Sequence, residues 1–188
     1  MPASTNSVAK IRIKELTQLI KQQPGNAQAY AERADAKMEM RDVYSAIKDY
    51  SIALTIASAT NTDHAAARVG RGNAFLEVGA YREALKDFEA VLAKDSSTEA
   101  LYGRAVARYY LDDYFGAIRD LDEVVAADPS HSKALCNRGI VKLELNQLED
   151  AIADLTLFLA HHPTHPEAAY SLSVATNRLQ KRIGKRSM

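Results

Sequence analysis

Four arginines in this sequence could form a site for phosphate, because arginine binds phosphate and carboxylate groups with two parallel N–H donors. Each of them, however, is followed sixteen residues later by an aspartate. The four pairs are Arg33 and Asp49, Arg71 and Asp87, Arg104 and Asp120, and Arg138 and Asp154. A row of arginines that binds phosphate or nucleic acid would leave the four aspartates unexplained. We therefore predict structural ion pairs, in which each arginine holds its own aspartate on a facing helix.

Other residues that could bind a metal or act in catalysis lack the partners that such chemistry needs. The stretch HHPTH contains His161, His162 and His165, but a metal site needs converging ligands and usually a further Cys or carboxylate. The single cysteine, Cys136, has no histidine at a diagnostic spacing and no nucleophile motif around it. We interpret the histidines as a solvated loop and the cysteine as a packing or groove residue. The sequence thus predicts no metal, no cofactor and no enzyme activity.

Composition narrows the class of partner. The formal net charge is zero and 47% of the residues are apolar, so no overall field attracts nucleic acid or a membrane surface. No stretch approaches the length of apolar sequence that crosses a bilayer, and the N-terminal region does not resemble a secretory signal. One cysteine allows no internal disulfide. The expectation is a soluble, cytoplasmic chain.

The arginines also mark an internal repeat, since they lie 38, 33 and 34 residues apart. Each is followed by a small residue: Ala34, Gly72, Ala105 and Gly139. Thirteen residues after each arginine stands an alanine: Ala46, Ala84, Ala117 and Ala151. Four residues later comes an aromatic residue or a leucine: Tyr50, Phe88, Leu121 and Leu155. Turn residues lie between the two halves of each repeat: Arg41-Asp42, Gly79, Asp112-Asp113 and Asn146-Gln147.

This pattern resembles the tetratricopeptide repeat (TPR) family over residues 27–163. The resemblance implies an all-α, right-handed superhelical solenoid of antiparallel helix pairs, with about ten helices. Residues 1–26 are predicted to hold an N-terminal capping helix, 27–163 four repeats, 164–182 a C-terminal capping helix and 183–188 a basic disordered tail. The 38-residue step leaves four extra residues near 60–64, which either add a helical turn or lengthen a loop.

The resemblance implies a non-catalytic scaffold or adaptor whose first helices line a concave groove for a partner segment. The predicted groove residues are Glu32, Asp35, Glu39, Val69, Asn73, Glu77, Tyr102, Val106, Tyr109, Tyr110, Lys133, Asn137 and Ile140. The groove is acidic towards the N-terminus and aromatic in the middle, so we expect a protein or peptide with apolar or aromatic anchors and some positive charge. Neither nucleic acid nor membrane is an expected partner, and a monomer is favoured over a homo-oligomer.

Two alternatives stay open. One subclass of the family binds the terminal carboxylate of heat-shock chaperones through a set of lysine, asparagine and arginine side chains. Asn73 and Lys133 match that set, whereas Val69, Gly103 and Asn137 stand where lysine, asparagine and arginine are needed. The first alternative, a chaperone-associated TPR co-chaperone, thus has two matching positions. The second alternative is a self-associating structural subunit of a larger assembly.

Overall fold

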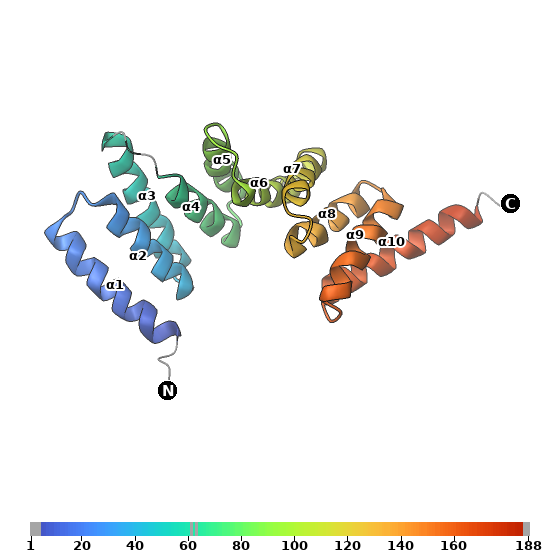
Figure 1. Cartoon of the computed structure of the whole chain (residues 1–188), viewed down its shortest axis with the longest axis horizontal. Coiled ribbons are helices and arrows are strands. Elements are labelled where there is room, and N and C mark those ends of the chain that lie inside the picture. The colour runs from blue at the N-terminus through green and yellow to red at the C-terminus, as the bar shows by residue number, and fades with distance from the viewer. Residues whose placement is uncertain (1–4, 61, 63, 186–188) are drawn as a thin grey trace. The chain divides into compact units, whose positions relative to one another are not determined.

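The chain folds entirely into α-helices. The computed structural model describes residues 5–60, 62 and 64–185, and over these residues it contains ten helices and no strand (Figure 1). The helices are α1 (Thr5–Gln22), α2 (Ala27–Glu39), α3 (Val43–Thr60), α4 (Ala65–Glu77), α5 (Tyr81–Leu92), α6 (Thr98–Tyr110), α7 (Tyr114–Ala127), α8 (Ser132–Glu144), α9 (Leu148–His161) and α10 (Pro166–Gly184). The predicted all-α class and the predicted number of helices are confirmed.

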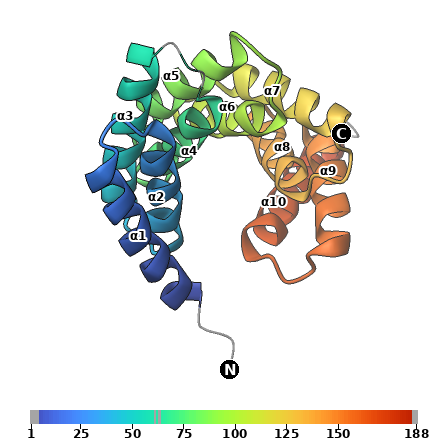
Figure 2. The ribbon, with the colours of Figure 1, turned by 60° about the vertical axis from the view of Figure 1, so that its left-hand side comes forward.

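The helices fall into two compact units, residues 1–103 and 104–188. In the first unit each helix from α1 to α5 packs against the next, and Figure 2 shows α1, α2 and α3 side by side. Buried alanines bring these helices close around Tyr50 and Leu54; they are Ala31, Ala34, Ala46, Ala53, Ala67 and Ala74. In the second unit α7, α8, α9 and α10 pack in the same successive manner. Its core is built around Leu135, Leu143, Leu148, Leu155 and Phe158.

The four arginine–aspartate pairs are present. In each pair the arginine Nε and Nη2 donate to the two carboxylate oxygens, at distances from 2.6 to 2.9 Å. The aspartates are only 2–6% exposed. A buried carboxylate needs such a partner, because an unpaired charge in the core is costly. Each pair therefore connects the first helix of its repeat to the second, with good geometry.

A second cation reaches the aspartate in three of the four repeats. Lys37, Arg108 and Lys142 each approach to 2.7 Å from Asp49, Asp120 and Asp154, respectively. Burial alone would raise the pKa of Asp49, but the hydrogen bonds from Arg33 and Lys37 outweigh it and lower that pKa.

The second repeat is different because Phe75 occupies the equivalent position. Its ring lies beneath the Arg71 guanidinium, 5.7 Å from the ring centroid. No second cation contacts Asp87 among the described residues. The substitution of a ring for a cation thus changes how this one aspartate is stabilised.

The turn inside each repeat ends its first helix in the same way. Arg41, Gly79, Asp112 and Asn146 all have positive φ, between 58° and 75°. The next residue donates its backbone N–H to the carbonyl five residues earlier, as Asp42 does to Lys37 at 3.0 Å. This is the Schellman arrangement, which satisfies carbonyls at the helix end. Of the four residues only glycine adopts this conformation without steric cost.

Rings and glycines fit together where successive repeats meet in the first unit. A Cβ added to Gly70 would lie 2.6 Å from the Tyr50 ring, and one added to Gly103 would lie 2.3 Å from the Phe88 ring. Real Cβ atoms do not approach so closely, so each glycine creates the space that the ring fills. Phe88 is accordingly fully buried.

The end segments differ from the predictions in detail. Helix α10 continues to Gly184, so the prediction of a disordered tail was wrong for residues 183 and 184. Basic side chains in the last turn, Lys181 and Arg182, favour the helical state at this end. Residues 186–188 of the predicted tail lie outside the described residues. The extra residues of the first repeat lengthen α3 to 18 residues, against 14 in α7 and α9, which resolves the alternative in favour of an added helical turn.

Candidate functional site

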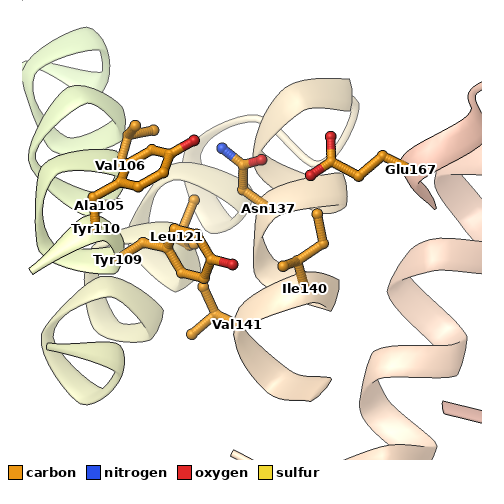
Figure 3. Close-up of a pocket in the computed structure, with 9 residues that line it drawn as sticks. All are labelled: Ala105, Val106, Tyr109, Tyr110, Leu121, Asn137, Ile140, Val141 and Glu167. Carbon is orange, nitrogen blue, oxygen red and sulfur yellow. The ribbon is translucent and has the colours of Figure 1, made fainter. Parts of the chain in front are cut away.

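A hollow of about 120 Å³ opens in the second unit between α6 and α8 (Figure 3). Its lining is Ala105, Val106, Tyr109, Tyr110, Leu121, Asn137, Ile140, Val141 and Glu167. Figure 3 shows the α6 side chains facing those of α8 across the hollow, with Glu167 of α10 at its edge. Five of the predicted groove residues are therefore brought together here: Val106, Tyr109, Tyr110, Asn137 and Ile140.

The hollow lies where the repeat pattern of a ring facing a glycine is broken. Leu121 stands at the repeat position of Tyr50 and Phe88, and Asn137 stands at the position of Gly70 and Gly103. Leucine lacks the reach of a phenyl ring. Leu121 is itself 1% exposed and forms part of the lining. At the Phe88–Gly103 joint of the first unit, by contrast, the ring occupies the space beside the glycine.

Three tyrosine rings lie together at one side of this hollow. Tyr109 contacts Tyr110 edge to face with centroids 5.3 Å apart, and it contacts Tyr114 at 5.8 Å. Tyr110 is 55% exposed. Such edge-to-face contacts fix ring positions, so the rim presents aromatic surface that is already ordered.

Carboxylates surround the aromatic rim. The pKa of Tyr109 is raised, first by burial and then by the negative charges of Glu144 and Glu167. Both glutamates are exposed, and neither has an ion-pair partner among the described residues. The rim thus has an uncompensated negative charge beside apolar and aromatic surface.

The first unit contains a larger hollow of about 470 Å³, with more carboxylates in its lining. The predicted groove residues Asp35, Val69 and Asn73 line it, together with Asp95 and Glu99. The buried Tyr50 hydroxyl donates to Asp35 at 2.5 Å, and the Asn73 amide donates to Glu99 at 3.2 Å. This hollow is therefore acidic, and its asparagine already has a partner.

The other predicted groove residues lie outside the two hollows. Glu39 approaches Arg12 at 3.5 Å and Glu77 approaches Arg41 at 3.4 Å. Glu32 accepts a hydrogen bond from the amide of Gln28. Tyr102 is half-buried, and Lys133 is exposed. Part of the acidic end of the predicted groove is thus neutralised by nearby arginines, although exposed pairs of this kind are weak.

Sequence reasoning missed several residues of the two hollows. Glu99 and Glu167 lie at the starts of α6 and α10, outside the inward positions that the repeat register predicts. Leu121 and Tyr50 were recognised only as a recurring position of the repeat. The sequence does contain a signal for Leu121. The residue before the arginine is glycine in the second and third repeats and asparagine in the fourth, and the asparagine follows the repeat in which Leu121 replaces the ring.

Three histidines cap helices or stack on a ring, and the cysteine is buried. His131 and His165 accept the backbone N–H of Ala134 and Ala168 on Nδ1, so they cap α8 and α10. His162 stacks on Phe158. Burial, and then the charge of Glu167, raise the pKa of the Cys136 thiol to about 11, which disfavours the thiolate that a nucleophile needs. No group of residues suited to a metal ion occurs in the described part of the chain.

Comparison with known proteins places the fold in a family. The tetratricopeptide repeat model matches residues 32–97, 69–132 and 102–166, so the chain belongs to the tetratricopeptide repeat family. Proteins of this family are generally non-catalytic interaction modules, and the fold implies a protein-interaction scaffold. None of the described helices is long and apolar enough to cross a membrane.

The match to an individual curated protein covers a smaller part of the chain than the family model does. Dynein axonemal assembly factor 4 of Pongo pygmaeus is 38% identical over 74 residues, which cover 37% of this chain and 18% of that protein. The matched region thus spans less than a fifth of that relative's length.

Two solved structures have similar folds. YrrB, a TPR protein with an unusual peptide-binding site, has a TM-score of 0.73 and 22% identity over 89% of this chain and 84% of its own. The first TPR of Spaghetti (RPAP3), bound to the HSP90 peptide SRMEEVD, has a TM-score of 0.58 and 27% identity over 62% of this chain and 93% of its own.

Proposed function

We propose that the chain is a non-catalytic adaptor that binds a segment of a partner protein, with an apolar or aromatic anchor seated in the hollow between α6 and α8. The observation that carries the proposal is this hollow, where an apolar floor meets an ordered rim of tyrosines. Tyrosines bury a large area at low entropic cost and are common hot spots of protein interfaces.

The charges favour a partner segment with positive side chains. Glu144 and Glu167 lie near Tyr109, and Asp35, Asp95 and Glu99 line the hollow of the first unit. A Lys or Arg that follows the anchor would meet unpaired carboxylates, whereas an acidic segment would meet repulsion. We accordingly propose that the predicted groove residues of each unit bind such segments, with those that line that unit's hollow as the centre.

A co-chaperone role is the second candidate, and the likeness to the TPR of Spaghetti bound to an HSP90 peptide favours it. Binding of a terminal carboxylate would use Asn73 and Lys133. Asn73, however, is hydrogen-bonded to Glu99, and carboxylates line the surrounding hollow. These contacts support the first proposal over the second.

Capture of the partner from a native extract, followed by titration of its binding segment as a peptide, tests the proposal. Tyr109→Ala is expected to weaken binding by about 1–2 kcal/mol or more, which is roughly tenfold, mainly through faster dissociation. Tyr44→Ala is the matched control, because Tyr44 is 77% exposed on α3 and lies outside both hollows.

Equal losses for the two tyrosines would place the partner elsewhere. The peptide SRMEEVD serves as the second ligand in the same assay. The co-chaperone role would be favoured instead if that peptide bound and Tyr109→Ala kept its affinity for the captured segment. Sedimentation at several concentrations checks the proposed monomer against a self-associating subunit.

A further inference from the structure

Four basic side chains form a stripe along one face of α10: Arg178, Lys181, Arg182 and Lys185. Their spacing of three and four residues places them on the same side of the helix, over about 10 Å of its length. With Asn146 and Leu148 at the turn between α8 and α9, they line a hollow of about 330 Å³. This basic stripe takes no part in the partner-binding site proposed above.

The requirements of folding do not explain the stripe. Arg182 donates to Glu149, but Arg178, Lys181 and Lys185 have no ion-pair partner among the described residues. Like charges three and four residues apart destabilise a helix. The helix dipole favours the cations of the last turn, Lys181 and Arg182, yet that effect does not extend to Arg178. The stripe thus places three cations, for which the described residues offer no ion-pair partner, close together at the end of the helix.

We propose that the basic stripe binds an acidic protein segment, whose Asp or Glu side chains enter the hollow and pair with the unpartnered cations. The charges of stripe and segment are complementary, and repulsion within the stripe is relieved when carboxylates arrive. A segment with several carboxylates along about 10 Å, which is roughly three extended residues, matches the length of the stripe.

A protein segment suits the stripe better than a membrane surface. Membrane-surface helices bury an apolar face in the lipid, but the apolar residues of α10, such as Leu172 and Leu179, already pack against the cores of the second unit. Ile183, at 57% exposure, lies beside the stripe, and one such side chain provides little apolar area for insertion.

The test is a fluorescence titration of the whole chain with a labelled, amide-capped hexaglutamate peptide. Binding is expected, with an affinity that falls as salt rises. Arg178→Gln/Lys181→Gln is expected to weaken peptide binding about tenfold, because the loss of each exposed charge lowers the affinity several-fold. Lys86→Gln/Arg119→Gln removes two exposed charges from α5 and α7 and is the matched control, with an expected change of less than about twofold.

Thermal unfolding separates loss of the site from loss of the fold. The stripe variant is expected to melt close to the wild type, because the relief of repulsion offsets the loss of one last-turn cation. Equal loss of binding in the control variant would show a general charge effect and overturn the proposal. The proposal would also be overturned if the peptide did not bind while phosphatidylserine vesicles bound in a stripe-dependent way. That result would favour a membrane surface.

Discussion

The second and third repeats share one plan but differ at equivalent positions. Phe88 of the second repeat fills the space above Gly103, and a Cβ on that glycine would lie 2.3 Å from the ring. Leu121 of the third repeat faces Asn137 instead, and a hollow of about 120 Å³ remains. The first joint is closed by the repeat's own side chains, whereas the second leaves a hollow lined largely by apolar residues. A hollow of this kind is found where the ring and the glycine of the repeat pattern are both replaced.

The same two repeats also stabilise their buried aspartates differently. Asp120 is held by Arg104 and by Arg108, both within 2.9 Å. Among the residues that the structure describes, Arg71 is the one cation that holds Asp87, because Phe75 replaces the second cation. The comparison predicts that the second repeat depends more strongly on its single arginine.

The largest expected effect is the loss of that arginine. Arg71→Ala should lower the free energy of unfolding by roughly 1–3 kcal/mol, because Asp87 would remain buried without a cation. Arg104→Ala should cost less, by about 1 kcal/mol, since Arg108 continues to neutralise Asp120. Denaturant unfolding of the two variants measures the difference.

A double-mutant cycle sharpens this comparison. Arg71→Ala combined with Asp87→Ala should cost less than the sum of the single changes, because the remaining charge has gone. Additive costs, or equal costs for Arg71→Ala and Arg104→Ala, would contradict the account of the two clamps.

A smaller effect concerns the histidines that precede first helices. His131 in the second unit accepts the backbone N–H of Ala134 at 3.1 Å, whereas His64 in the first unit makes no side-chain capping bond to α4. His131→Ala should therefore destabilise the protein by about 1 kcal/mol, and His64→Ala should change stability little. His131→Asn should restore most of the loss.

Thermal melts of the three histidine variants check this prediction. A loss for His64→Ala as large as that for His131→Ala would show that the difference in capping does not determine stability. Failure of asparagine to substitute for His131 would show that the ring acts by packing and not as a hydrogen-bond acceptor.

Much of the fold was predictable because its determinants repeat. The arginine, the small residue after it and the later alanine recur in every repeat, so one correct reading of the register gives all four helix pairs. The sixteen-residue spacing of Arg138 and Asp154 likewise fixes a contact between facing helices. Periodic signals survive variation at single positions: Lys142 and Phe75 hold equivalent places in their repeats, and the arginine–aspartate pair forms in both.

The site was less predictable because it depends on volumes and not on periodicity. Val106, Tyr109 and Ile140 were named from the register, but the hollow that they line also involves Leu121 and Asn137, which face each other from successive repeats. Such a pairing joins side chains from successive repeats, and a single-repeat pattern does not show it. Glu167 entered the site from a helix that the sequence suggested only as a cap.

The most direct test of the central claim is to close the hollow with the joint that the molecule already uses elsewhere. Leu121→Phe/Asn137→Gly copies the pairing of Phe88 with Gly103, and Asn137→Gly alone controls for loss of the amide. The measurement is a titration of the captured partner segment, with a thermal melt of each variant. The account predicts a folded double variant whose affinity falls at least tenfold, about 1.4 kcal/mol, while Asn137→Gly binds nearly as well as the wild type. A folded double variant that binds with unchanged affinity would contradict the claim that the hollow between α6 and α8 receives the partner.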